Sequence, residues 1–445
     1  MTIESYTEKA AERIRLLMRA LQHRNYRLFF AGQTLSLIGT WMQQIAMSWL
    51  VYRITGSAML LGVVGFASQI PTFLLAPFAG VLADRWNKHR VLLWAQTLAM
   101  LQAIVLTVLV LGNMVQVWHI IVLSVFIGMV NAFDIPARQS FLIEMIERRE
   151  DLGNAIALNS SMMNGTRLIG PSIAGILIAA VGEGICFLLN ALSYLAVIAA
   201  LLAMRVKPKK EKGGSKSILH ELREGISYAY HSAPIKAILM LIALVSLMGI
   251  PYTVLLPVFA RDILHGEAHT YGFLMAAAGT GAFASALLLA SRRTVLGLGK
   301  FIPIAAAVFG VAVAAFAFSR VLWLSLALLF VAGLGMMAQI ASSNTILQTI
   351  VDDDKRGRVM SLFTMSFMGV APFGSLLAGA LADRIGVTYT LLAGGLVCIV
   401  GAAVFASKLR MLRDHIIPVY RRKGILPEVA AGIQSATELT APPED

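Results

Sequence analysis

The sequence predicts an all-α membrane protein with twelve transmembrane helices, arranged as two pseudo-symmetric six-helix bundles. Three observations support this fold class. The 445 residues are 58% hydrophobic and only 14% charged, whereas soluble domains carry about 25% charged residues. Apolar stretches of about 20 residues, long enough to cross a hydrocarbon core of about 30 Å, recur along almost the whole chain. A basic segment near the middle separates six of these stretches from the other six.

The chain divides into five parts on this basis. Residues 1–27 are charged, can form an amphipathic helix and lack the apolar core of a signal peptide. Two six-helix halves at 28–204 and 235–407 flank a linker at 205–234, whose last part is an expected surface helix, and a polar tail follows at 408–445. The spans are expected at 28–52, 58–83, 91–112, 117–137, 153–181, 184–204, 235–260, 270–291, 301–319, 321–345, 357–382 and 387–407.

Basic residues fix the predicted orientation. Lys and Arg concentrate before the first span, after the last span, in the linker and in alternate loops. The other loops hold only Arg53, Arg261, Arg320 and Arg384. Because basic loops remain in the cytoplasm, both termini are expected there. This asymmetry also explains the net charge of +13, so no nucleic-acid partner is needed to account for it.

The two halves show weak internal similarity. Residues 141–158 align with 345–362, which pairs Gly153 with Gly357. A parallel repeat of six-helix halves is a known plan of secondary transporters, in which the substrate binds near the midplane between the halves. The chain has no GxxxxGK[ST] stretch to bind ATP. We therefore expect no cofactor, and an ion gradient, most simply of protons, as the energy source.

A charged motif follows the second span. The stretch GVLADRWNKHR at 80–90 matches the pattern G-x-x-x-D-R-x-G-R-[KR]-[KR] through the residues Gly80, Asp84, Arg85, Lys88 and Arg90. Asn87 replaces the second glycine, and Asn is the other residue that best tolerates a left-handed backbone. The letters LADR recur at 381–384, in the expected outer loop, as a relic of an inverted repeat or by coincidence.

This motif and three further stretches resemble the major facilitator superfamily over essentially the whole chain. The stretches are GTWMQQIAMSWLVYRITGS at 39–57, the run from PARQ to GPSIAG at 136–175, and KRGRVMSLF at 355–363. They are similar to the branch of enterobactin exporters and macrolide-efflux proteins. The resemblance implies a bacterial inner-membrane carrier that works by alternating access, is monomeric and is not an enzyme.

The resemblance also assigns roles to two motifs. It implies that Asp84 bridges to the start of span eleven, where Arg356 and Arg358 are available, and closes the cytoplasmic side in the outward-facing state. The alternative is that these charged side chains only set the membrane orientation and extend to the membrane surface. The run NGTRLIGPSIAG resembles an exporter motif of span five through its small residues and its proline, although ordinary helix packing gives a similar pattern. Gly170, Pro171 and Gly175 fit this motif, whereas Gly165 lies one residue too far from Gly170 and Ala174 replaces a glycine.

Three charged residues fall within the spans or at their ends. Arg167 lies close to the midplane, where a cation is costly unless it faces water or a partner. It can contact an anionic substrate or Asp134, or it can donate hydrogen bonds to carbonyl groups. Asp134 stands four residues before Arg138, so the two share a helix face. Asp134 is either the group that carries the coupling proton or half of a structural clamp.

Uncharged polar residues suggest a cavity. They are Gln33, Thr40, Gln43 and Gln44 in span one, Asn159 and Asn164 in span five, and Tyr252, Gln339 and Asn344 in spans seven and ten. Some such residues serve only as hydrogen-bonding contacts between helices. With many Met and Phe residues nearby, the cavity would suit an amphipathic molecule. No catalytic or metal-binding motif is present, and Cys186 and Cys398 are expected to be buried thiols.

The expected function is proton-coupled export of a small amphipathic, siderophore- or drug-like molecule. Import or lipid movement by the same fold is a first alternative. A membrane sensor or scaffold that transports nothing is a second, against which the polar helix faces and the gate motif argue. Expected partners are the substrate, protons and membrane lipids.

Overall fold

The computed structural model describes residues 18–205, 218–292, 294–352 and 355–422. Within these ranges it describes all side chains except those of 76–77, 80–85, 149, 218–223, 225 and 422. Every secondary-structure element of the described residues is a helix or a helical turn. The expectations for the first 17 residues, for 206–217 and for the end of the tail therefore lie outside the described residues.

The first half contains six long helices. They are preceded by a short turn, η1 (Arg19–Gln22), and a second turn, η2 (Arg149–Asp151), precedes the fifth of them. The helices are α2 (Arg24–Thr55), α3 (Ala58–Arg85), α4 (Lys88–Leu111), α5 (Val117–Glu144), α6 (Leu152–Val181) and α7 (Glu183–Ala203).

The second half also crosses six times, but two of its spans are interrupted. The seventh span consists of α9 (Ala233–Met248), α10 (Tyr252–Val258) and the π-turn η3 (Phe259–Ile263), and the eleventh of α14 (Arg356–Thr364), the π-turn η4 (Met365–Gly369) and α15 (Ala371–Ile385). The uninterrupted spans are α11 (Ala268–Ala290), α12 (Leu298–Phe318), α13 (Leu322–Ile350) and α16 (Val387–Ser407). Prolines at the starts of α10 and α15 explain the breaks, because proline lacks the N–H that would continue the helix.

Among the described residues, eleven spans are long and apolar enough to cross a membrane by length and composition. Helix α2 is not among them, although its 32 residues make it the longest helix. Its polar residues lower its mean hydropathy, and it nevertheless packs inside the first bundle against α6 and α7. With α2 counted, the predicted fold of twelve transmembrane helices in two bundles is confirmed.

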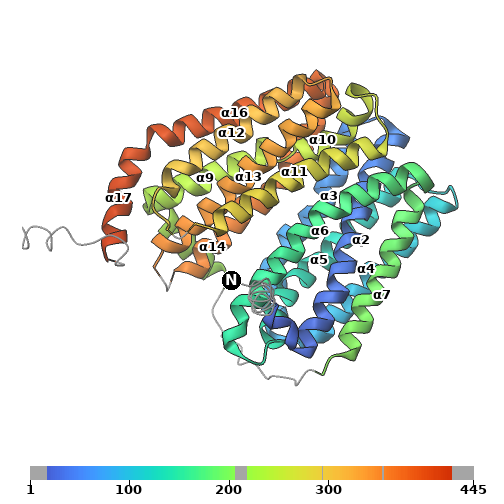
Figure 1. The fold of residues 1–445 in the computed structure, drawn as a ribbon, viewed down its shortest axis with the longest axis horizontal. Helices are drawn as coiled ribbons and strands as arrows, with labels where there is room; N and C mark the ends of the chain where they lie inside the picture. The colour runs from blue at the N-terminus through green and yellow to red at the C-terminus, as the bar shows by residue number, and fades with distance from the viewer. Residues whose placement is uncertain (1–17, 206–217, 293, 353–354, 423–445) are drawn as a thin grey trace, which may run out of the picture.

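The two bundles lie side by side, with α2–α7 in blue to green and α9–α16 in yellow-green to orange (Figure 1). They touch mainly along two helix pairs, α6 with α11 and α3 with α15, and α10 makes smaller contacts with α2 and α3. We call the face that carries the first and last described residues the terminal face, and the opposite face the distal face. The distal face carries the ends of α2, α6 and α15 and the starts of α3, α7 and α11.

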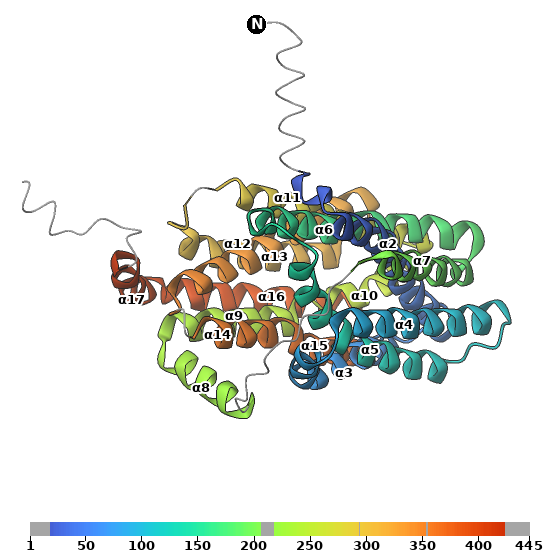
Figure 2. The same ribbon diagram turned by 90° about the horizontal axis from the view of Figure 1, so that it is seen from below.

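Two helices outside the bundles extend from the second half (Figure 2). Helix α8 (Ile218–His231) matches the surface helix expected at 218–232. Helix α17 (Leu409–Arg422) lies in a region that the sequence analysis assigned to a tail. Its apolar residues Leu412, Ile416 and Tyr420 recur at helical spacing, which is the signal that could have predicted it. At the other end, α2 begins at Arg24, so the last residues of the expected N-terminal amphipathic segment already belong to the first span.

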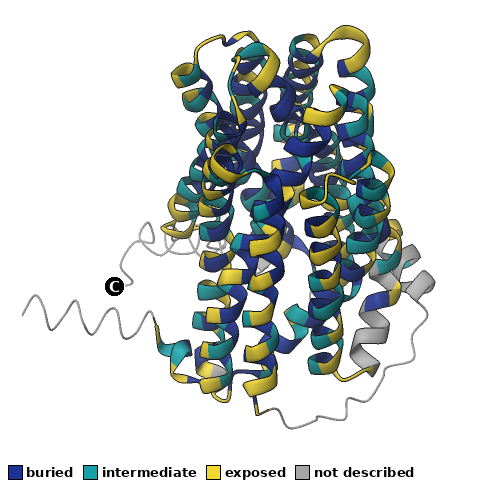
Figure 3. Cartoon of the chain, turned by 90° about the vertical axis from the view of Figure 1, so that its right-hand side faces the viewer, coloured by how far each residue is buried: buried dark blue, intermediate teal, exposed yellow. Residues whose placement is uncertain are grey.

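Large apolar side chains are exposed on the helices. Figure 3 marks the exposed positions of the chain in yellow. Examples are Trp94 at 69%, Leu202 at 67% and Trp323 at 78% exposure. Exposed apolar area on this scale is incompatible with water and suits the acyl chains of a bilayer.

Candidate transport site and gates

Asp134 is buried in the terminal-face half of α5, about one turn past the middle of the helix. Its Oδ1 atom accepts a hydrogen bond from Gln96 Nε2 of α4 at 2.8 Å, and its Oδ2 atom lies 3.4 Å from Arg138 Nη2. Asp134 is 5% exposed, so the carboxylate depends on these two partners to offset its desolvation. The structure thus brings Asp134 and Arg138 together as their spacing predicts, and it adds Gln96, which the sequence analysis did not select.

A second buried polar network connects three helices of the first half. Gln43 of α2 donates a hydrogen bond to Gln102 of α4 at 2.9 Å, and Asn190 of α7 donates to Gln43 at 2.8 Å. All three side chains are at most 6% exposed. Gln43 therefore lies inside the first bundle, and Gln33 is likewise buried there. These two candidates for the substrate cavity are separated from the neighbouring Thr40 and Gln44, which are exposed.

Arg167 lies in the middle of α6, on the side that faces the second half. Its guanidinium carbon is 5.8 Å from the centroid of the Trp41 ring of α2. It lies within electrostatic range of Tyr252 of α10. Among the described side chains, no carboxylate pairs with Arg167, since the partner of Asp134 is Arg138. A cation over an aromatic ring at this depth can bind an anionic or aromatic group.

The small residues of α6 differ in what they contact. A Cβ atom on Gly170 would lie 2.5 Å from Trp41 Cβ, and one on Gly175 would lie 2.9 Å from the carbonyl oxygen of Ala268 in α11. Pro171 is buried in the same segment, and its carbonyl oxygen faces Gly272. Gly165, in contrast, has nothing within 4 Å of the added Cβ. Three residues of the expected motif thus lie at close helix contacts, and Gly165 does not.

The second half presents polar groups without a protein partner. Among the described residues, the Tyr252 hydroxyl, both amide atoms of Gln339 and the hydroxyl groups of Ser342 and Ser343 are buried and form no hydrogen bond. Groups of this kind are costly unless water or a ligand reaches them. The remaining candidates, Asn159, Asn164 and Asn344, are partly exposed on α6 and α13, where Asn164 and Asn344 bond only within their own helices.

The hydrogen bonds that the structure describes between the two halves all lie at the distal face. The Tyr52 hydroxyl at the end of α2 bonds to the Asp262 carboxylate, and Arg261 Nη1 donates to the Tyr52 carbonyl oxygen at 3.4 Å. Asp383 at the end of α15 accepts hydrogen bonds from the Ala58 N–H at 2.9 Å and from the Ser57 hydroxyl at 3.1 Å. The distal side is therefore closed by direct contacts between the halves.

The expected gate motif lies at the terminal face, at the junction of α3 and α4. The side chains of Asp84 and Arg85 and the surroundings of Gly80 lie outside the described part, so the bridge from Asp84 stays a prediction. Lys88 is buried and lies 3.0 Å from Glu144 Oε1. Asn87 does not adopt the left-handed conformation, because its φ is −67°; its side chain instead caps α4 by accepting a hydrogen bond from the Arg90 N–H at 3.1 Å.

The two arginines expected to face Asp84 lie at the start of α14. Arg358 Nη1 is 2.8 Å from Glu224 Oε2 of α8. Arg356 is half-buried and also has an interaction partner. Helix α8 therefore competes for at least one of the charges assigned to the gate.

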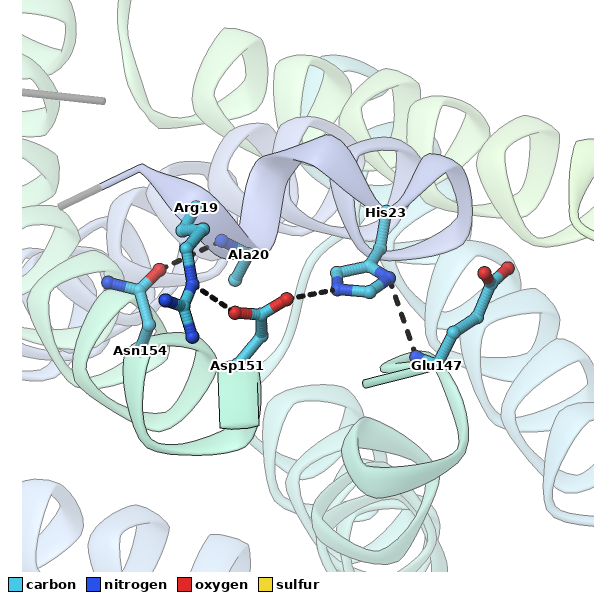
Figure 4. Close-up of polar contacts among 6 residues, drawn as sticks. All are labelled: Arg19, Ala20, His23, Glu147, Asp151 and Asn154. Carbon is cyan, nitrogen blue, oxygen red and sulfur yellow. Dashed lines mark hydrogen bonds and ion pairs between the residues drawn. The ribbon is translucent and has the colours of Figure 1, made fainter. Parts of the chain in front are cut away.

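A cluster around the buried Asp151 joins η1 and the residue before α2 to the turn η2 and the start of α6 (Figure 4). The Asp151 carboxylate pairs with the Arg19 guanidinium through Oδ1 and lies 2.9 Å from His23 Nε2 through Oδ2. Asn154 Oδ1 accepts a hydrogen bond from the Ala20 N–H at 2.9 Å. The hydrogen bond with His23, together with the Arg19 charge, lowers the pKa of Asp151 below its usual range.

Comparisons with known proteins identify the family. A family model described as a transmembrane secretion effector matches residues 18–430. The chain belongs to this family. Together with the relatives and solved structures below, this match shows a transporter of the major facilitator type and not an enzyme, which confirms the resemblance seen in the sequence. It is a multi-span membrane protein with bacterial transporters as relatives.

Several curated relatives are similar over nearly their whole length. The staphyloferrin A transporter of Staphylococcus aureus is 26% identical over 390 residues, covering 86% of this chain and 97% of that protein. The multidrug efflux pump Tap of Mycolicibacterium fortuitum is 27% identical, covering 86% and 96%. The macrolide efflux protein A of Streptococcus pyogenes is 24% identical, covering 88% and 99%.

Solved structures share the fold. A bacterial homologue of the human lysosomal transporter Spinster, in an inward-facing and unoccupied conformation, matches with a TM-score of 0.69 and 14% identity, covering 88% of this chain and 98% of that one. A bacterial homologue of the iron transporter ferroportin matches with a TM-score of 0.66 and 19% identity, covering 86% and 99%.

Proposed function

We propose that this transporter exports a small amphipathic molecule, siderophore- or drug-like, across the bacterial inner membrane in exchange for protons. Relatives named for a siderophore, for several drugs and for macrolides support both the substrate class and the outward direction. The proposal needs no cofactor and takes the proton gradient as the energy source. The protein would act as a monomer surrounded by membrane lipids.

The observation that carries proton coupling is the buried Asp134. It is an ionisable group in an apolar bundle, and among the described side chains its charged partner is Arg138 alone. A proton that binds to Asp134 removes its charge and releases Arg138 and Gln96 from the carboxylate. Since α4 and α5 pack together through this contact, protonation can change the position of one helix against the other.

The orientation follows from the distribution of basic residues. With both termini in the cytoplasm, the terminal face is cytoplasmic and the distal face is external. The inter-half hydrogen bonds then close the external side, so the structure corresponds to an inward-facing state that can load substrate from the cytoplasm. In the opposite state Asp84 would bridge to the start of α14, with Arg356 or Arg358 as its partner.

The substrate would bind between the halves, close to Arg167 and Trp41. The exposed Thr40 and Gln44 lie on the same helix as Trp41, and the unpartnered Tyr252 and Gln339 lie in the second half. Import or lipid movement by the same fold remains the second candidate, since the contacts at Asp134 and Arg167 set no direction of flux.

Everted membrane vesicles test the proposal. Adding siderophores or macrolides to vesicles with an established proton gradient should cause proton efflux and uptake of the compound. Asp134→Asn should abolish this exchange while the protein level in the membrane stays normal. Asp414→Asn, on the exposed surface of α17, is the matched control and should behave like the wild type.

The outcomes separate the parts of the proposal. Absence of substrate-induced proton movement across the whole panel would reject coupling. A normal rate of substrate–proton exchange in Asp134→Asn would show that Asp134 has only a structural role, as the partner of Arg138. Accumulation only in right-side-out vesicles would favour import.

A further inference from the structure

Helices α3 and α15 form an antiparallel pair across the boundary between the halves. A Cβ atom on Gly62 of α3 would lie 3.1 Å from Gly379 Cα, and one on Gly379 would lie 3.0 Å from Gly62 Cα. The two glycines therefore mark a close backbone crossing, which allows the helices to pivot against each other with little obstruction.

The same sequence pattern ends both helices. α3 ends in GVLADR at 80–85, and α15 carries GALADR at 379–384 before its last residue. In each copy the aspartate stands four residues after the glycine, so both lie on one helix face. Because the helices are antiparallel, each aspartate lies at the end where the other span begins.

In the second copy the contact is visible. Gly379 touches α3, and one helical turn later Asp383 reaches the first residue of α3. Asp383 Oδ1 accepts a hydrogen bond from the Ala58 N–H, and Oδ2 accepts one from the hydroxyl of Ser57, whose Oγ also caps Leu60 N–H at 3.3 Å. The carboxylate thus satisfies a free backbone donor at a helix N-terminus, where the helix dipole favours a negative charge.

We propose that Asp383 is the latch of the distal gate: it holds the start of α3 while the terminal side is open, and it must let go when the halves rock. This inference deepens the alternating-access cycle of the proposed function. Asp383 is a positioning residue, since it acts through α3 and not on the substrate. The latch is exposed to water and consists of two hydrogen bonds, so it is weak enough to break in every cycle.

The geometry of the α3–α15 pair implies that only one of its two ends can be closed at a time. A rocking motion about the Gly62–Gly379 crossing separates one end of the helix pair as it closes the other. Asp383 then holds the distal end in one state, and the sequence places Asp84 to hold the terminal end in the other. The repeated LADR would be functional at both sites, with opposite effects on the conformational equilibrium.

Distance measurements between spin labels test this directly, in full-length protein reconstituted without substrate. One label pair, Met114 and Val321, reports the distal separation of the halves. A second pair, Glu150 and Thr294, reports the terminal separation. All four positions are exposed and lie outside the contacts described above.

Asp383→Asn and Asp383→Ala should lengthen the distal distance and shorten the terminal one. The population ratio should change by about two- to fivefold, as expected for a carboxylate at an exposed helix N-terminus. Ser57→Ala, which removes one of the two hydrogen bonds, should give a smaller shift in the same direction. Asp84→Asn should shift both distances the opposite way. Arg384→Gln, at an exposed neighbouring residue, should leave both distributions unchanged.

Unchanged distances in both Asp383 variants and in Ser57→Ala would overturn the latch. A change in which both separations increase together would also overturn it, because that result indicates loosened packing and not a shift between two states. The distance measurement needs neither substrate nor a proton gradient. It can therefore support the latch even where the transport assay rejects proton-coupled export.

Discussion

Gly175 of α6 and Gly272 of α11 lie in direct backbone contact across the boundary between the halves. A Cβ atom on Gly175 would lie 3.0 Å from Gly272 Cα, and one on Gly272 would lie 2.9 Å from Gly175 Cα. This contact is the counterpart of the Gly62–Gly379 crossing on the other side of the boundary. Glycine pairs thus allow both helix pairs to approach closely, which side chains of any size would prevent.

Gly175→Ala should therefore destabilise the protein, because the added methyl group meets the backbone of α11. We expect a loss of about 1–3 kcal/mol, typical of overpacking, together with slower transport. Gly165→Ala is the matched control in the same helix: its methyl group meets nothing within 4 Å, and alanine favours a helix over glycine by about 1 kcal/mol. Thermal unfolding of the purified variants measures the difference. Equal stability of the two variants would contradict the close contact.

The buried network at Gln43 gives a second prediction. Gln43→Met removes both of its hydrogen bonds and leaves Gln102 and Asn190 with unpaired amide groups. We expect a loss of about 0.6–1.7 kcal/mol, between the average and the largest value measured for hydrogen bonds between transmembrane helices. Gln44→Met, at an exposed position one residue along, should leave thermal stability unchanged. If Gln44→Met proved the more damaging for stability, the assignment of these two faces of α2 would be wrong.

The cluster around Asp151 should protect the backbone amides around Ala20 from hydrogen exchange. Asp151→Asn removes the charge that pairs with Arg19 and weakens the bond to His23, so amide hydrogen exchange around Ala20 should become several-fold faster. Glu150→Gln, an exposed neighbour, should not change it.

The same cluster has a defined pH dependence. The pKa of Asp151 is lowered in the folded protein. The Asp151 charge therefore stabilises the folded segment fully above the usual pKa range of an aspartate, near pH 4. It is lost as the pH falls through the lowered folded value. The part of the protection that depends on the Asp151 charge should therefore be lost only in acid. A loss of protection between pH 6 and 8 that persists in Asp151→Asn would show that another group controls this segment.

The sequence was sufficient for the fold because length and apolar composition determine where a chain crosses a bilayer. All twelve expected spans are present, including the polar α2, and the largest difference is at α5, which continues to Glu144 beyond the expected end at 137. The interruptions at Pro251 and Pro372 were missed, since proline is compatible with a continuous membrane helix as well as with a broken one.

Contacts within the candidate site could be predicted from the sequence only where both residues are neighbours on one helix. The Asp134–Arg138 pair follows from its spacing, whereas Gln96, which lies on another helix, does not. Gln43 and Gln44 look alike in sequence, but they occupy opposite environments because α7 packs against one side of α2, where Gln43 bonds to Asn190 and Gln102. The role of Asp383 depends on which helix lies across the boundary, and a single sequence carries no such information.

Arg167 provides the prediction that bears most directly on substrate choice. Its guanidinium lies over Trp41 at the middle of α6, and no described carboxylate neutralises it. An anionic group of the substrate can therefore bind there by a charge-assisted hydrogen bond while an aromatic group stacks on Trp41. Arg167→Gln should weaken binding of anionic substrates about tenfold or more, the effect of losing one hydrogen bond to a charged group.

Arg167→Lys should retain part of this affinity, because it keeps the charge but loses the planar donor group. Trp41→Phe should weaken aromatic substrates more than aliphatic ones, since the larger indole ring gives the stronger cation–π and stacking contact. Equilibrium binding of matched anionic and neutral compounds to the purified variants measures both effects. If Arg167→Gln weakened anionic and neutral ligands equally, the arginine side chain would not bind the anionic group of the substrate.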